Sequence, residues 1–288
     1  MTRCFFVSDL HGHQAAYREL FNRVASEKPL AVFMGGDLLP LTFPSHNYPS
    51  HDFIYDFLLP ELTRLRHRMT TAYPKIFLIM GNDDARTEEI AVLELQNQGL
   101  VHYIHNKHLE LEPYTIFGYS YIPPTPFPLK DWERYDVSRY VGPGDVSPED
   151  GIRTIRVDEY EKKYSTIKDD LTFLVGDVSL DRAIFLFHAP PYHTHLDRCE
   201  SDGIKIDGVP LDTHVGSIAI RSLIETRQPL LTLHGHIHES SRLTGAWRDR
   251  IRRTHLFSAA YDGDELALIQ FDLEDLERAV RRLIPLKE

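Results

Sequence analysis

The sequence predicts an α/β domain, in which strands and helices alternate along the chain. Short apolar runs alternate with helix-like stretches through the first hundred residues, a pattern typical of βα units. Small polar groups rich in Asp and His follow the apolar runs, where strands would end. With 288 residues, 42% of them hydrophobic, the chain can bury a substantial core, and we expect one domain over residues 1–288.

The predicted elements follow in chain order. Buried strands are expected at 4–7, 30–34, 75–80 and 114–121. Helices are expected at 13–25, about 52–68 and 86–97. The second half should contain a polar helix at about 158–175, a helix starting near His214, and strands at 183–187, 229–234, 254–260 and 265–273. The stretch 274–284, rich in Glu, Arg, Leu and Ala, is expected to form a closing helix.

Two segments lack a clear period and are expected to be irregular cap or lid loops. They lie near 122–151, which is rich in Pro and Gly, and near 189–212. The aromatic residues of the first segment could cover a site, or they could pack the loop back onto the body of the protein. They are Phe127, Trp132, Tyr135 and Tyr140.

Charge and composition exclude several classes of protein. The formal net charge is -11 and no run of Lys and Arg is present, so we expect no long nucleic acid as a partner. Cys4 and Cys199 are the only cysteines, which excludes a disulfide framework and a Cys-x-x-Cys site. Without a signal-peptide core or a long apolar span, we expect a cytoplasmic protein that does not bind membranes.

Residues that commonly bind metals follow five of the predicted strands. They are Asp9 and His11, Asp37, Asn82 to Asp84, His188, and His234, His236 and His238. A lone Asp at a strand end is usually a turn former, and a lone buried His is usually a hydrogen-bonded core residue. However, the carboxyl ends of parallel strands share one edge of a sheet, so five such groups would converge there.

The residue types indicate which metals could bind at this edge. Carboxylate, imidazole and amide ligands without thiolate suit manganese, iron, zinc or cobalt in a hydrolytic site. Two cations about 3.5–4 Å apart need a bridging ligand, and Asp37, which follows two glycines, is the candidate. Spacing alone does not separate His234, His236 and His238, because alternate residues of a strand point to the same side.

Taken in order, these groups resemble the calcineurin-like metallophosphoesterase superfamily, whose pattern runs D-x-H, G-D, G-N-H-[DE], H and G-H-x-H. The corresponding residues are Asp9 and His11, Gly36 and Asp37, Gly81, Asn82 and Asp84, His188, and Gly235, His236 and His238. The region 212–240 is also similar to a poorly characterised bacterial and archaeal branch. The resemblance implies a four-layer αββα sandwich, with two mixed sheets flanked by helices.

The resemblance also implies a ligand set and a reaction. One divalent cation would be held by Asp9, His11, Asp37 and His238. The other would be held by Asp37, Asn82, His188 and His236, leaving His234 in a supporting role. The two metals would be manganese, iron, zinc, nickel or cobalt. The implied activity is hydrolysis of a small phosphodiester or phosphomonoester by a metal-bridging hydroxide.

One residue departs from the pattern, because Asp83 stands where the family has a histidine that assists at the leaving group. Three interpretations follow: a protonated Asp83, a substitute histidine, or slow turnover of activated substrates. The candidate substitutes are His193, His195 and His214. The alternative functions are a nuclease of the same superfamily and a scaffold that has lost catalysis. The protein could also associate into a homo-oligomer.

Overall fold

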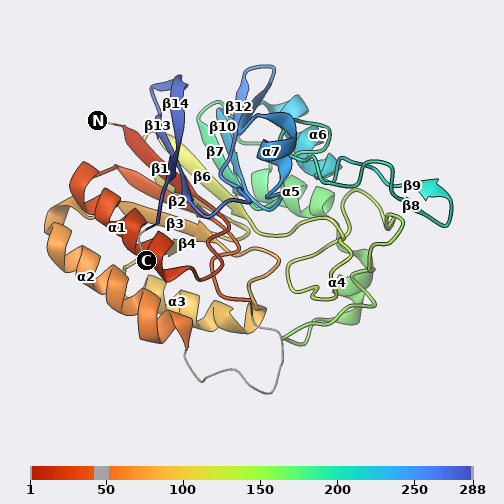
Figure 1. The fold of residues 1–288 in the computed structure, drawn as a ribbon, viewed down its shortest axis with the longest axis horizontal. Coiled ribbons are helices and arrows are strands. Elements are labelled where there is room, and N and C mark those ends of the chain that lie inside the picture. The colour runs from red at the N-terminus through yellow and green to blue at the C-terminus, as the bar shows by residue number, and fades with distance from the viewer. Residues whose placement is uncertain (1, 42–51, 287–288) are drawn as a thin grey trace.

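The computed structural model describes residues 2–41 and 52–286, whose strands form two six-stranded sheets and one small hairpin (Figure 1). Sheet A has the spatial order β14 (Asp275–Ile284), β13 (Leu266–Asp272), β1 (Arg3–Val7), β2 (Ala31–Gly35), β3 (Lys75–Ile79) and β4 (His102–Tyr103). Sheet B has the order β11 (Arg248–Ile251), β12 (Thr254–Ser258), β10 (Leu231–His234), β7 (Ala183–Phe187), β6 (Tyr114–Tyr119) and β5 (Lys107–Leu111). The hairpin pairs β8 (Lys205–Ile206) with β9 (Val209–Pro210).

Helices cover the outer faces of the two sheets. On sheet A lie α1 (Gln14–Glu27), a π-helical turn (Ile54–Leu58), α2 (Leu59–Met69) and α3 (Glu89–Asn97). On sheet B lie α5 (Ile167–Val175) and α6 (Ile218–Arg227), while α4 (Glu159–Tyr164) and α7 (Ser240–Thr244) are short. Short 3-10 turns span Thr70–Ala72 and Arg86–Glu88. The expected four-layer sandwich is therefore confirmed (Figure 1). No helix in the described ranges is long and apolar enough to cross a membrane.

The central strands are buried on both faces. In β1, Cys4 and Phe6 face the core between the two sheets, whereas Phe5 and Val7 face the core beneath the helices. Double burial explains why these strands are continuous apolar runs in the sequence. The strands β1 to β4 run parallel to one another, as do β6, β7, β10 and β12. Both sheets are mixed, because β13, β14, β5 and β11 are antiparallel to their neighbours.

The eight predicted strands are all present, with ends shifted by at most two residues. The helix expected at about 158–175 is instead two helices, because Thr166 has an extended backbone and its Oγ1 accepts from Asp169 N at 3.0 Å to start α5. The helix expected near His214 begins at Ile218, where the Ser217 side chain caps it. The short, exposed strand β5 and the hairpin β8–β9 lack an apolar run and were not predicted.

The closing helix predicted at 274–284 is wrong, because this stretch is strand β14. It pairs antiparallel with β13 from Leu266↔Ile284 to Asp272↔Asp275. Leu276 and Ala279 are buried in the core between the sheets. Glu, Arg, Leu and Ala favour helix locally, but this preference is a few tenths of a kcal/mol per residue, and pairing with a neighbouring strand overrides it.

Candidate metal centre

The candidate ligands lie on turns that directly follow parallel strands. Four of them have a left-handed backbone, with φ of 57° at Asp9, 42° at His11, 51° at Asp37 and 75° at His236. This conformation is uncommon for non-glycine residues and costs energy unless the surroundings impose it. Here Asp9 N donates to Gly36 O at 3.0 Å and His11 N donates to Asp37 O at 2.9 Å. The turns after β1 and β2 therefore hold each other in these conformations.

Two glycines allow the turns to approach closely. A Cβ atom at Gly81 would lie 2.3 Å from Asp37 Oδ1, and one at Gly235 would lie 2.0 Å from Ser8 Oγ. Neither distance is compatible with a side chain. Only glycine therefore fits at these positions of the G-N and G-H-x-H blocks.

The turns bring candidate ligand atoms together in two groups, each with its atoms within 4.8 Å of one another. The first group is Asp9, His11, Asp37 and His238, and the second is Asp37, His188 and His236. Asn82 adjoins the second group, since its Oδ1 lies 3.0 Å from His188 Nε2. Either group could hold a metal ion, and Asp37 belongs to both.

The residues present fit a bound cation. Asp9 Oδ2 and His11 Nδ1 are buried, and neither has a hydrogen-bond partner among the described residues. An unsatisfied buried carboxylate oxygen costs the free energy of its desolvation. The Nε2 atoms of His11 and His238 also lie only 3.3 Å apart. A divalent cation accepts oxygen and imidazole nitrogen donors of this kind.

The carboxylates and imidazoles of the two groups shift one another's pKa. Burial opposes charge at Asp9 and Asp37, but His238 and His188 outweigh it and lower the pKa of both carboxyls. Burial likewise disfavours the protonated form of His188, yet the Asp37 carboxylate raises its pKa to about 10. Both aspartates are therefore held in the charged form that binds a cation.

Two consecutive aspartates after β3 have different roles. Asp84 is fully buried and accepts from Gly81 N at 2.8 Å, Leu38 N at 2.9 Å and Leu39 N at 2.7 Å, which ties the turns after β2 and β3 together. Asp83 lies beside both groups: its N donates to Asp37 Oδ1 at 2.8 Å, and its Oδ2 lies 3.7 Å from His11 Nδ1. Burial and the Asp37 carboxylate raise the pKa of Asp83 to about 6.

His234 belongs to neither group and faces the protein interior. Its Nδ1 lies 2.9 Å from the carbonyl oxygen of Ala189, and its Nε2 lies 2.7 Å from Thr232 Oγ1. Because a carbonyl only accepts, Nδ1 carries the proton and Nε2 accepts from the hydroxyl. Burial lowers the pKa of His234 to about 3. The neutral ring thus fixes the backbone immediately after His188.

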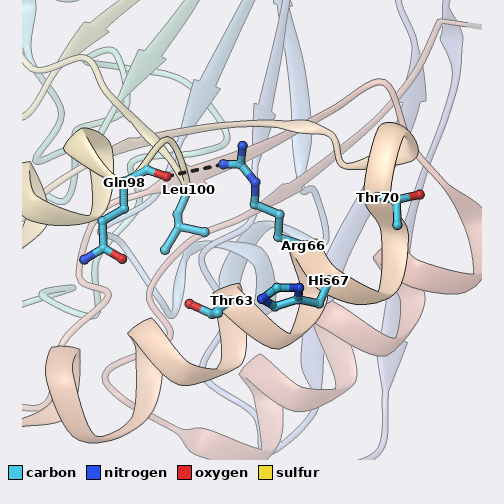
Figure 2. Close-up of a pocket in the computed structure, with 6 residues that line it drawn as sticks. All are labelled: Thr63, Arg66, His67, Thr70, Gln98 and Leu100. Carbon is cyan, nitrogen blue, oxygen red and sulfur yellow. Dashed lines mark hydrogen bonds between the residues drawn. The ribbon is translucent and has the colours of Figure 1, made fainter.

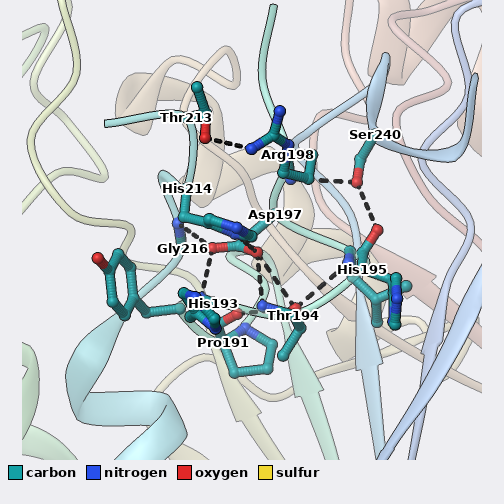
Figure 3. A network of polar contacts seen from close by, with 12 residues as sticks. Pro191, His193, Thr194, His195, Asp197, Arg198, Thr213, His214, Gly216 and Ser240 are labelled. Carbon is teal, nitrogen blue, oxygen red and sulfur yellow. Dashed lines mark hydrogen bonds and ion pairs between the residues drawn. The ribbon is translucent and has the colours of Figure 1, made fainter. Parts of the chain in front are cut away.

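The three candidate substitute histidines also lie outside the two groups, and His195 is separate from the other two (Figure 3). His214 Nδ1 lies 2.8 Å from Asp197 Oδ1, and the His193 ring stacks on His214 at 4.5 Å. His195 instead pairs through Nδ1 with Asp249 Oδ2 at 2.9 Å and points away from the other two. The sequence reasoning missed Asp197, which looks like an ordinary loop residue in "THLDR" but is fully buried.

A cavity of about 390 Å³ lies at the end of α2, apart from the candidate ligands (Figure 2). It is lined by Thr63, Arg66, His67, Thr70, Gln98 and Leu100. Arg66 Nη1 donates to the Gln98 carbonyl at 3.4 Å. The lining contains no carboxylate and none of the strand-end residues, so it does not contribute to the metal centre.

Comparisons with known proteins agree with this geometry. The family model of the calcineurin-like phosphoesterases matches residues 2–240. The crystal structure of TT1561 of Thermus thermophilus is similar with a TM-score of 0.54 and 16% identity, covering 98% of each chain. Another crystal structure reaches a TM-score of 0.61 at 12% identity, covering 98% of this chain and 99% of its own. At these identities the likeness concerns the fold alone.

No curated protein sequence matches the chain. The family match over most of its length shows that the chain belongs to the calcineurin-like phosphoesterases.

Proposed function

We propose that the protein is a dinuclear metal-dependent phosphoesterase that hydrolyses a small phosphodiester or phosphomonoester. Membership of the family supports hydrolysis of a phosphate ester. The single observation that supports two metals is that Asp37 belongs to both Asp/His groups. A carboxylate has two oxygens and can bridge two cations, which an imidazole normally does not do.

In this proposal, one cation is held by Asp9, His11, Asp37 and His238, and the other by Asp37, Asn82, His188 and His236. Bound cations would lower the pKa of water and neutralise charge on the phosphoryl oxygens.

The protein's own contribution is to orient the ligands. His188 Nδ1 lies 2.8 Å from Gly35 O, which fixes the proton on Nδ1 and leaves Nε2 to face Asn82 and Asp37. His236 N donates to Asp9 Oδ1 at 3.0 Å, which orients that carboxylate.

The charge of the chain supports a small substrate. The net charge of -11 and the lack of a continuous Lys and Arg run in the sequence weigh against a nuclease that binds long nucleic acid. The scaffold alternative draws support from Asp83, but the complete set of seven ligand types weighs against it.

Metal analysis together with a substrate screen tests the proposal. We expect the purified protein to bind two divalent cations and to hydrolyse phosphomonoesters or phosphodiesters with added manganese, nickel or zinc. Asp37→Asn removes the shared ligand and should lower activity by more than about 100-fold, since changes outside the ligand set already cost about 10- to 100-fold. Asp177→Asn, at an exposed position after α5, is the matched control.

The outcomes separate the parts of the proposal. One bound cation with retained activity would contradict the dinuclear centre but not the phosphoesterase activity. A protein that binds no metal, with Asp37→Asn as active as the control, would exclude the proposed function and favour the scaffold.

A further inference from the structure

A buried carboxylate organises the segment that follows His188. Asp197 accepts through Oδ2 from His193 N at 2.8 Å and Gly216 N at 3.1 Å (Figure 3). Its Oδ1 accepts from Thr194 N and His214 Nδ1, both at 2.8 Å. Because an ionised carboxylate only accepts, the Nδ1 atom of His214 must carry the proton. His214 is thereby held in one orientation, and Nε2 is the ring nitrogen that Asp197 does not contact.

The two imidazoles of this network are available to a ligand. The Nε2 atom of His214 makes no hydrogen bond to any described residue, and the side chain is 17% exposed. His193 is exposed, and its ring stacks on His214 at an interplanar angle of 28°. His193 also has a left-handed backbone, with φ of 57°, which it shares with four of the candidate ligands. Such conformations persist where the surroundings impose them, often at functional sites.

The network lies between the two loops that carry the candidate histidine ligands. On one side, Ser217 N donates to Pro190 O at 2.9 Å, two residues after His188. On the other side, Ser240, two residues after His238, donates to His195 O at 2.8 Å and accepts from Arg198 N at 3.2 Å. Both loops emerge from parallel strands of sheet B, so the network is hydrogen-bonded to the segments that directly continue from His188 and His238.

We propose that His214, positioned by Asp197, donates the proton to the leaving-group oxygen of the ester. This inference rests on the proposed function. In this step the His214 ring carries a proton on each nitrogen. As water adds to phosphorus, the bond from phosphorus to the leaving oxygen breaks and the Nε2 proton passes to that oxygen, which leaves a neutral ring protonated on Nδ1. The proton released by the water restores His214. Asp197 acts as a positioning residue.

A series of aryl phosphate esters with leaving groups of increasing basicity tests the proton donor. In His214→Gln we expect rates on the poorest leaving groups to fall by about 10²- to 10⁴-fold, the usual contribution of a general acid. The most activated esters should lose only a few-fold, because their leaving oxygen departs without a proton. His108→Gln, on the exposed strand β5, is the matched control and should follow the wild-type line.

Two outcomes of this series would overturn the inference. One is a loss in His214→Gln that is uniform across leaving groups, which indicates a structural role. The other is a leaving-group dependence that appears in Asp83→Asn or His195→Ala but not in His214→Gln. If the wild-type protein hydrolyses no ester with any metal, the proposed function itself fails, which is a different result from either.

A second measurement does not depend on turnover. In metal-loaded protein with ¹⁵N-labelled histidine, we expect inorganic phosphate to shift the Nε2 resonance of His214, assigned by its loss in His214→Ala. A phosphate titration that leaves this resonance unchanged would also overturn the inference, because the ring would then not reach the phosphoryl site.

Discussion

The two irregular segments, 122–151 and 189–212, look alike in sequence but are fixed to the protein very differently. In the first, Lys130 to Glu133 are buried, the Trp132 Nε1 donates to Asp84 O at 2.8 Å, and Asp131 accepts from Arg86 N at 2.9 Å. In the second, the part around Asp197 is anchored, whereas the β8–β9 hairpin is exposed, with Val209 at 50%. A segment without regular structure can thus belong to the core.

This difference also bears on the expected lids. Trp132 and Tyr135 are buried, while Phe127 and Tyr140 are 57% and 72% exposed. Trp132 donates a hydrogen bond to the backbone of the turn that carries Asn82 and Asp83, so the first segment stabilises that turn. Whether either segment closes over a substrate stays a prediction.

The largest expected effect is at the anchored segment. Trp132→Ala removes a completely buried aromatic side chain and should lower the free energy of unfolding by about 3–5 kcal/mol. Phe127→Ala, in the same segment but exposed, should change it by less than about 0.5 kcal/mol. Urea unfolding measures both. Equal effects of the two substitutions would mean that the segment is not part of the core.

An intermediate effect is expected where Asp136 contacts the start of α6. Asp136 Oδ2 accepts from Ile218 N at 2.6 Å and its Oδ1 accepts from Ala219 N at 3.2 Å, so it caps α6 from another part of the chain. Asp136→Ala should lower the free energy of unfolding by about 1–2 kcal/mol, as the loss of a helix cap does. Asp136→Asn keeps an acceptor and should recover part of that loss in the same unfolding measurement. A loss below about 0.5 kcal/mol for Asp136→Ala would show that Ser217 alone caps α6.

The smallest effect is expected at the exposed hairpin. Val209→Thr changes a side chain that is 50% exposed, so the free energy of unfolding should change by less than about 0.5 kcal/mol. Thermal or urea unfolding provides the check. A loss above about 2 kcal/mol would mean that the hairpin packs against something in solution, which would remove the contrast between the two segments.

The sequence by itself determined the inner strands and the residue types at their carboxyl ends. Strands buried on both faces need continuous apolar runs, and a metal site built on their ends needs Asp, Asn and His directly after those runs. Both signals are local, so they can be recognised in the sequence without knowledge of the tertiary contacts. The glycines at 81 and 235 are visible in the sequence, but the reason that nothing larger fits, the approach of Asp37 and Ser8, is tertiary.

Tertiary structure decided the features whose partners are distant in the chain. Residues 275–284 form a strand because they pair with β13, although the composition of these residues favours a helix. Asp197 organises His193 and His214 because its acceptors meet donors up to 19 residues away. Trp132 is a core residue because its ring is completely buried and its Nε1 donates a hydrogen bond to Asp84 O, 48 residues earlier. In each case burial and a hydrogen bond from a distant residue set the role, and neither can be read from neighbours in sequence.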